Sequence, residues 1–353
     1  MKTMNRIDVQ SAGMTDIGNH RTENQDQFLI ADLTNSVRMH SGSLCQGQGG
    51  RLFGDSMGHL FLVADGMGGH RGGEEASRFA VQYCINSILN RSDWMAHIEP
   101  ADEDAFVEDL GEMLHNAHLA MEAHSKSAPG YTGMGTTLTL AYVDWPRMYI
   151  LHAGDTRCYL FRNSELRLVT QDHTVANEMM RKGQLAPEEI ERSQWSNVLV
   201  NALGAGAASV VPDVYKLDLM AGDSILLCSD GLNKHVPDLQ IRRTLLDCDE
   251  PLQSCEQLVL LAKQGGGTDN ITVIRAKFTD PTPGKNRMKL FMSSAVEENI
   301  LQDLQIPKSE LDTSEIEPRE NAPLASQKAT EEESGGKDTV DFSENEEEGS
   351  SFR

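Results

Sequence analysis

Residues 136–170 read TTLTLAYVDWPRMYILHAGDTRCYLFRNSELRLVT, and this stretch decides the fold. Polar and apolar residues alternate within it, as in Thr137-Leu138-Thr139-Leu140 and Arg157-Cys158-Tyr159-Leu160. This period of two predicts strands at 136–143, 148–153, 157–162 and 166–170. The connections between them are short, which favours antiparallel pairing because parallel strands need a long crossover.

Five more strands are predicted on the same grounds, at 27–33, 59–64, 210–217, 223–229 and 271–278. Two helical patterns precede residue 136, at 73–90 and 102–126, and each has one apolar face. Nine strands with few helices between them favour two packed sheets over a doubly wound parallel sheet. The predicted fold class is therefore α+β, built on a β-sandwich of two antiparallel sheets.

The chain has 353 residues, and its composition divides it into two parts. Residues 1–280 carry the strands and helices and are expected to form one domain. Within it, the polar segment 174–204 lies between two strands and is predicted to be an excursion or flap over one end of the sheets. Residues 281–353 are rich in Glu, Ser and Gly, and are predicted to be an acidic, mostly disordered tail.

Charge and composition restrict the partners. The formal net charge of −23 argues against binding to nucleic acid or to an anionic membrane face. No stretch approaches the roughly 20 apolar residues of a membrane span, and the N-terminus has no apolar core of signal-peptide length. The six cysteines form no C-x-x-C pair and are expected to be reduced. We expect a cytoplasmic protein.

Aspartates stand beside the ends of predicted strands. Asp65 follows the apolar run 61–64, and Asp230 follows a similar run at 225–229; each is followed by glycine. Asp155 and Asp269 flank two further apolar stretches. Hard divalent cations prefer carboxylate oxygens, and glycine allows the backbone to approach closely. The recurrence predicts a metal site, although a single Asp-Gly pair is more often a turn.

These aspartates belong to seven motifs. In chain order they are Arg21-Thr22-Glu23-Asn24-Gln25-Asp26, Ala64-Asp65-Gly66-Met67-Gly68-Gly69-His70, Gly133-Met134-Gly135-Thr136-Thr137, Ala153-Gly154-Asp155-Thr156-Arg157, Gln171-Asp172-His173-Thr174, Cys228-Ser229-Asp230-Gly231-Leu232 and Gly267-Thr268-Asp269-Asn270-Ile271-Thr272. In this order and spacing the series resembles the metal-dependent serine/threonine protein phosphatases, the type 2C or PPM family, in its bacterial branch. The resemblance covers about residues 8–280 and leaves the tail outside.

The resemblance implies a sandwich with a pair of antiparallel helices on each outer face, and two Mg²⁺ or Mn²⁺ ions at one end between the sheets. By motif position, Asp65 would bridge the two ions and the Gly66 carbonyl would bind one. Asp230 and Asp269 would complete the pair, and Asp155 with Asp230 would match a possible third site.

The same resemblance gives roles in catalysis. Asp26 would hold metal-bound water, and Arg21 would bind phosphate through its planar fork. Two cations lower the pKa of a bridging water towards neutrality, so the implied reaction is attack of a metal-bridging hydroxide on the phosphorus of phosphoserine or phosphothreonine in proteins. The expected partners are phosphoprotein substrates of a serine/threonine kinase, and the protein is expected to be a monomer.

The chain departs from other members of the family at three places. Gln25 and Met67 replace an acidic residue and a histidine, which leaves His70 as a candidate general acid or a structural residue. Asn201 stands where relatives often have arginine. His173 more plausibly orders a turn than binds a metal.

Two other functions fit the sequence less well. A regulatory pseudophosphatase of the same fold would lack metal ligands, yet all three core aspartates are present. A haloacid dehalogenase-type hydrolase would need Asp-x-Asp-Gly, but Val63 and Cys228 occupy the required first positions.

Overall fold

The computed structural model describes residues 7–38, 51–68, 72–90, 98–99, 101–127, 129–281 and 290–291, all of which lie in the first of the chain's two units, Met1–Leu311. Its strands form two sheets in which every pair of neighbours is antiparallel. The five-stranded sheet has the order β1-β12-β11-β7-β8. Its strands are β1 (Asp8–Asp16), β12 (Ile271–Thr279), β11 (Ser224–Cys228), β7 (Arg157–Arg162) and β8 (Glu165–Leu168).

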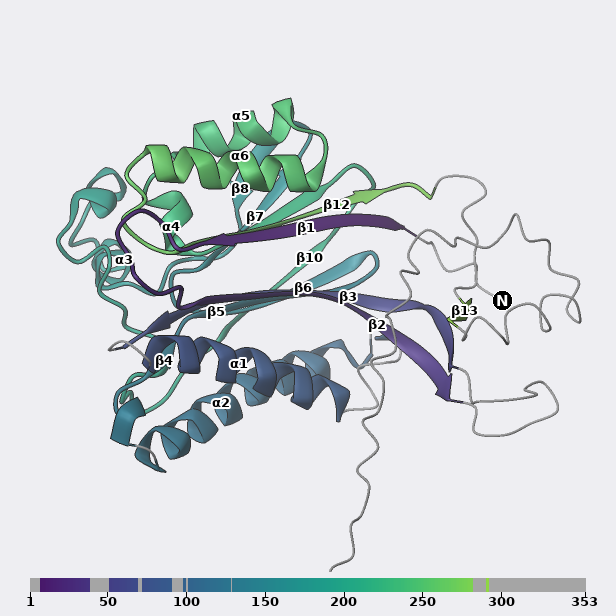
Figure 1. Cartoon of the computed structure of the whole chain (residues 1–353), viewed down its shortest axis with the longest axis horizontal. Coiled ribbons are helices and arrows are strands. Elements are labelled where there is room, and N and C mark those ends of the chain that lie inside the picture. Colours follow the sequence, from purple (N-terminus) through teal and green to yellow (C-terminus); the bar gives the residue numbers. More distant parts are fainter. Residues whose placement is uncertain are drawn as a thin grey trace, which may run out of the picture. The chain divides into compact units, whose positions relative to one another are not determined.

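The second sheet has eight strands, and β3 lies at its centre. The path runs β10-β6-β5-β3-β4-β9, and β2 and β13 also pair with β3. The strands are β2 (Asp26–Arg38), β3 (Arg51–Met67), β4 (Gly135–Thr136), β5 (Leu138–Asp144), β6 (Arg147–Ala153), β9 (Leu203–Gly204), β10 (Asp213–Asp218) and β13 (Leu290–Phe291). The two sheets face each other as the middle layers in Figure 1.

Alternation along the strands builds the interior. In β3, Phe61 and Val63 point to the space between the sheets, whereas Leu60 and Leu62 belong to the core under the helices. In β11, Ile225 and Leu227 lie between the sheets, and the neighbouring residues of that strand face the opposite side. Burying each such side chain contributes about 1.5–3 kcal/mol, so the period of two fixes which way each strand faces.

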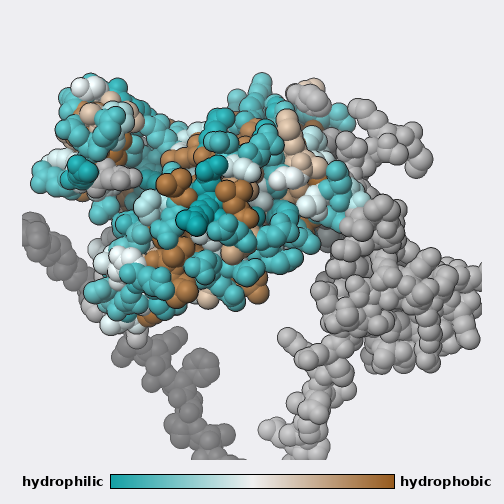
Figure 2. Space-filling view, turned by 90° about the horizontal axis from the view of Figure 1, so that it is seen from above, coloured by the Kyte–Doolittle hydropathy of each residue, from teal (hydrophilic) through white to brown (hydrophobic). Residues whose placement is uncertain are grey.

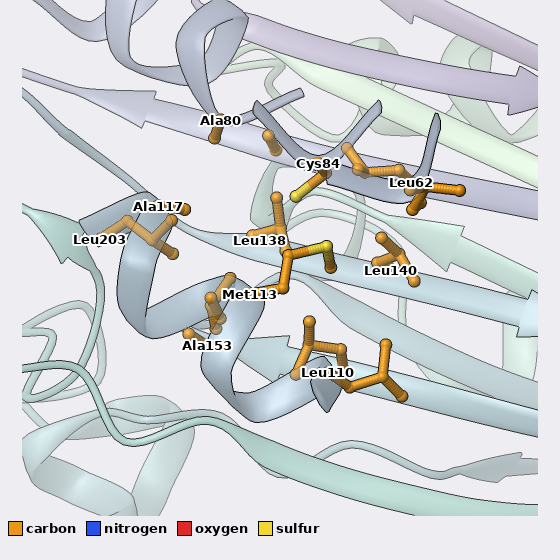
Figure 3. Packing of buried hydrophobic residues seen from close by; sticks show 14 of the residues in the cluster. Leu62, Ala80, Cys84, Leu110, Met113, Ala117, Leu138, Leu140, Ala153 and Leu203 are labelled. Atoms are coloured by element: carbon orange, nitrogen blue, oxygen red, sulfur yellow. The ribbon is translucent and has the colours of Figure 1, made fainter. Parts of the chain in front are cut away.

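Helices cover both outer faces of the sandwich (Figure 1). On the eight-stranded sheet lie α1 (Gly72–Leu89) and α2 (Glu103–Ser127), followed by a 3-10 turn, η2 (Pro129–Tyr131). Their apolar faces pack on strand residues such as Leu138 and Leu140, and Figure 3 shows Cys84 of α1 and Met113 of α2 pointing into this layer.

The five-stranded sheet is covered by α5 (Asp238–Asp247) and α6 (Pro251–Gln264), with the short α4 (Asp230–Asn233) beside them. Figure 2 views the molecule from this side, where hydrophobic side chains are interspersed among hydrophilic ones. Leu239 and Leu252 are among the exposed apolar residues of these helices.

The segment 174–204 lies between β8 and β10 in the chain, and its role as a flap stays a prediction. It contains α3 (Val175–Arg181), a 3-10 helix η3 (Pro187–Arg192) and β9. Thr174 caps α3, because its side chain accepts a hydrogen bond from the N–H of Asn177.

The predicted fold class, a sandwich with helix pairs outside, is confirmed, and each of the nine predicted strands is present. The sequence did not predict β1 or the short strands β4, β9 and β13. The boundary at residue 280 stays a prediction, because apart from 281 and 290–291 the tail lies outside the described residues. No helix in the described part of the chain is both long and apolar enough to cross a membrane.

Candidate metal centre

Strand pairing brings distant aspartates to one end of the sandwich. Asp26 begins β2 and pairs directly with Asp65, near the end of the antiparallel β3. Asp230 follows the end of β11, and Asp269 precedes the start of β12, its antiparallel neighbour. Asp155 lies in the turn between β6 and β7, where the start of β7 pairs with the end of β11. Asp230 begins α4, which is labelled near one end of the sandwich in Figure 1.

Asp26 is buried and links the two sheets. Its Oδ2 accepts hydrogen bonds from the hydroxyls of Ser229 and Thr272, both 2.7 Å long; Thr272 lies in β12 of the other sheet, and Ser229 directly follows β11 of that sheet. Its Oδ1 is buried and has no hydrogen-bond partner among the described residues. Burial, helped by the charges of Asp230 and Asp269 and opposed by the hydrogen bonds from the two hydroxyls, raises the pKa of Asp26 to about 7.

Asp65 lies in the middle of this acidic group. Burial raises its pKa well above the ordinary value, and the charges of the other four aspartates raise it further. Its backbone is held in place: its carbonyl accepts a hydrogen bond from the Thr137 N–H at 2.9 Å and another from the Thr136 hydroxyl at 2.8 Å.

Gly66 has no room for a side chain. A Cβ there would lie 2.1 Å from the carbonyl oxygen of Gly73 and 2.7 Å from that of Gln25, and both are backbone atoms. The Gly66 N–H donates to the Gln25 carbonyl at 3.1 Å. Glycine at this position therefore lets the end of β3 pass close to the start of α1.

Asp155 and Asp230 are both buried at the junction of the sheets. Burial raises the pKa of Asp155 well above its usual value, and Asp230 and Asp172 add to the rise. Burial also raises the pKa of Asp230, although the Lys234 ammonium opposes it. The Asp230 Oδ1 is a second buried oxygen without a hydrogen-bond partner among the described residues.

Asp269 differs from the other four because two cations hold it. Burial alone would raise its pKa, but the hydrogen bond from Arg21 and the charge of Lys234 bring it below the ordinary value. Arg21 donates through Nε to Oδ1 at 2.8 Å and through a terminal nitrogen to Oδ2 at 2.9 Å, and Lys234 Nζ lies 3.3 Å from Oδ2. Arg21 is thus at the site, and its side chain is 52% exposed.

The donor set fits hard divalent cations. Five carboxylates meet there, two of their oxygens lack any described hydrogen-bond donor, and burial together with their mutual repulsion raises the pKa of most of them. Among the described residues no three acidic, histidine or cysteine side chains stand in a ready coordination arrangement. Arg21 forms an ion pair with Asp269, and Lys234 forms ion pairs with both Asp230 and Asp269.

Two polar residues beside the site have structural roles. His173 accepts a hydrogen bond from the Gly154 N–H at 3.2 Å and contacts Asp213 at 3.1 Å, so it orders the turn that carries Asp155. Asn201 contacts the same His173 at 2.8 Å and binds both backbone groups of Val211, which fixes the base of the 174–204 segment. The candidate His70 lies outside the described residues.

Sequence reasoning missed several residues that shape the site. Ser229 and Thr272 hold Asp26, and Asn270 links the site to the loop before β2 by accepting from the Gln25 N–H at 2.9 Å. Lys234 was also missed, although its place four residues after Asp230 in a helical turn could have indicated the pair.

A two-sheet sandwich with a cluster of carboxylates at one end is the architecture of the metal-dependent protein phosphatases. The profile of the family described as "Protein phosphatase 2C" matches residues 36–258. The chain belongs to this family, as its motifs suggest. It is a metal-dependent protein phosphatase that removes phosphate from serine and threonine residues, and its relatives give no support to a pseudophosphatase.

Similar proteins agree with this. The chain is 33% identical over 270 residues to protein phosphatase PhpP of Streptococcus pneumoniae, a match that covers 74% of this chain and 94% of that protein. It is 31% identical over 215 residues to serine/threonine phosphatase Stp of Listeria monocytogenes, covering 61% and 82%. The crystal structure of the Mycobacterium tuberculosis phosphatase PstP/Ppp superposes with a TM-score of 0.62 at 28% identity, covering 78% of this chain and all of that one.

A second structure, described as the catalytic domain of PstP in complex with two manganese ions, has a TM-score of 0.60 and 29% identity, and covers 78% of this chain and all of that one.

Proposed function

We propose that Asp65, the Gly66 carbonyl, Asp230 and Asp269 hold two divalent cations, and that Asp155 with Asp230 forms a possible third site. The observation that carries the proposal is the convergence of five buried or partly buried aspartates from separate segments, where burial and the charges of neighbouring aspartates raise the pKa of Asp26, Asp65 and Asp155. Such repulsion is costly unless cations offset it. The two manganese ions of the similar PstP structure support Mn²⁺ for this chain, and Mg²⁺ would suit the same oxygen donors.

When bound, the cations supply Lewis-acid chemistry: they acidify a water molecule near neutral pH and offset the charge of the phosphoryl group. Asp26 accepts a proton or a hydrogen bond from water through its free Oδ1, while the Ser229 and Thr272 hydroxyls keep the other oxygen fixed. This arrangement aligns a water molecule without making Asp26 itself a nucleophile.

Arg21 binds the substrate's phosphoryl group at the rim of the site. Its guanidinium has five N–H donors, and Asp269 engages only part of them. The side chain is 52% exposed, so it is accessible to a phosphate on a protein surface. A planar fork suits two phosphate oxygens better than a lysine ammonium would.

The substrates are phosphoproteins made by a serine/threonine kinase. The negative charge of the chain favours neither nucleic acid nor anionic membranes as partners. We place the protein in the cytoplasm as a monomer.

The test is manganese-dependent hydrolysis of a phosphothreonine peptide by the full chain. Asp230→Asn should lose at least about a hundredfold in kcat/KM, because it removes a ligand of the cations. Asp218→Asn is the control. Asp218 ends the edge strand β10, and its exposed carboxylate pairs with Arg147. Equal turnover by the wild-type protein and Asp230→Asn would overturn the ligand assignment.

A further inference from the structure

Lys234 places an ammonium group inside the acidic cluster. Its Nζ forms an ion pair with Oδ2 of Asp230 and lies 3.3 Å from Oδ2 of Asp269. The side chain is only 25% exposed. Neither the motifs nor the similarity to known phosphatases gives this residue a role.

The backbone fixes the position of Lys234. It caps α4 at the end opposite Asp230, and its N–H donates to the Asp230 carbonyl at 3.0 Å. Residues four apart on a helical turn lie on the same side, so Lys234 has to face the carboxylate of Asp230. Asp269 reaches the same ammonium from the loop before β12, 35 residues further along the chain.

The ammonium stays charged in this position. Burial lowers the pKa of Lys234, but Asp230, Asp269 and Asp155 together raise it above the ordinary value. One cation therefore interacts with three of the carboxylates that hold metal in the proposed function. Arg21 on the other side of Asp269 is half exposed, whereas Lys234 lies deeper in the site.

We propose that the Lys234 ammonium is the counter-cation of the metal-free site. It holds Asp230 and Asp269 together before metal binds, and an entering divalent cation displaces it. This rests on the proposed function, because it takes those two aspartates as ligands. A divalent ion that binds both carboxylates must break the two ion pairs that they form with Lys234. It then remains close to the positive charge of the Lys234 ammonium, which repels it. Lys234 therefore weakens metal binding and stabilises the metal-free protein.

The test is Mn²⁺ binding to the full chain, measured by calorimetry and by the electron paramagnetic resonance signal of free Mn²⁺. Lys234→Gln should bind Mn²⁺ at least about tenfold more tightly at the weaker site, because the competing charge is gone. Lys234→Arg keeps the charge and should bind as weakly as the wild-type protein. The matched control is Lys277→Gln. Lys277 lies near the far end of β12, is similarly little exposed at 19%, and pairs with Asp249.

A second readout needs no activity. In EDTA, Lys234→Gln should melt at a lower temperature than the wild-type protein, and added Mn²⁺ should remove the difference. If the variant folds only with metal, its affinity is measured by competition with a chelator on the Mn²⁺-loaded protein.

The outcomes separate the two proposals. Equal Mn²⁺ affinities for the wild-type protein and Lys234→Gln would overturn the role of Lys234 and leave the metal centre intact. Absence of Mn²⁺ binding in the wild-type protein, or unchanged binding in Asp65→Asn, would overturn the metal centre and with it the role of Lys234.

Discussion

The buried carboxyl of Asp26 makes the stability of the metal-free protein depend on pH. Its pKa rises from 3.8 to about 7 on folding, mainly because the group leaves water. The folded chain therefore keeps a proton that the unfolded chain releases above about pH 4. The stabilisation from this protonated carboxyl is fully present below about pH 4, the pKa in the unfolded chain, and is lost as the pH rises through the folded-state pKa of about 7.

The size of the effect follows from linkage. One proton difference changes the free energy of unfolding by about 1.4 kcal/mol per pH unit, so between pH 5 and 7 Asp26 alone accounts for at most about 3 kcal/mol. Asp65 and Asp155 have raised pKa values and act in the same direction, whereas Asp269, whose pKa is lowered, is ionised in both states over this range and adds no slope. The metal-free protein should therefore lose stability from pH 5 to pH 8.

The assay is urea denaturation in EDTA at pH 5, 6, 7 and 8. The amide of Asp26→Asn keeps an oxygen that can accept hydrogen bonds from Ser229 and Thr272, but the amide cannot ionise. The free energy of unfolding of this variant should therefore fall with pH less steeply than that of the wild type, by up to about 1.4 kcal/mol per pH unit. Asp218→Asn, at an exposed site, should match the wild-type slope. A metal-free protein that gains stability between pH 5 and 8, or equal slopes for the wild type and Asp26→Asn, would refute the reasoning.

Three further substitutions test the site. Gly66→Ala forces a Cβ to within 2.1 Å of the Gly73 carbonyl and should lower the free energy of unfolding by about 2–4 kcal/mol in urea; an unchanged midpoint would count against the close packing. Asn270→Ala removes three hydrogen bonds to backbone groups between residues 17 and 25. It should lower the free energy of unfolding by about 2–4 kcal/mol in the same assay, and a decrease below about 1 kcal/mol would contradict this prediction. Arg21→Lys should raise KM for a phosphopeptide about tenfold, because lysine lacks the planar fork of arginine. Stability should be almost unchanged, because the ion pair of Arg21 with Asp269 is half exposed. An unaffected KM would show that Arg21 does not bind phosphate.

Strand periodicity was sufficient to predict the sandwich. Four strands form where the pattern of residues 136–170 places them, and β5, β6 and β7 bury side chains in a core on each of their two faces. β1 escaped prediction because Asp8–Asp16 contains small and polar residues and none of them is fully buried. Its strand character comes from pairing along its whole length with β12, more than 250 residues away, which local sequence does not encode.

The acidic residues of the site were predictable, but their counter-ions were not. An aspartate beside a glycine at a strand end has a local signature, so Asp65 and Asp230 could be found from the sequence. Lys234 and Arg21 are ordinary basic residues until folding brings Asp269 between them. The pairings of Asp269 depend on the register of distant strands, whereas Lys234 and Asp230 lie within one helical turn.

The most direct test of the metal centre is a crystal structure of the full chain grown with Mn²⁺, with anomalous differences collected at the manganese edge. We predict two strong anomalous peaks within coordination distance of Asp65, Asp230 and Asp269, with the Lys234 ammonium moved off its two carboxylates. Peaks elsewhere on the molecule, or none, with Asp230 and Asp269 still bound to Lys234 and Arg21, would contradict the account.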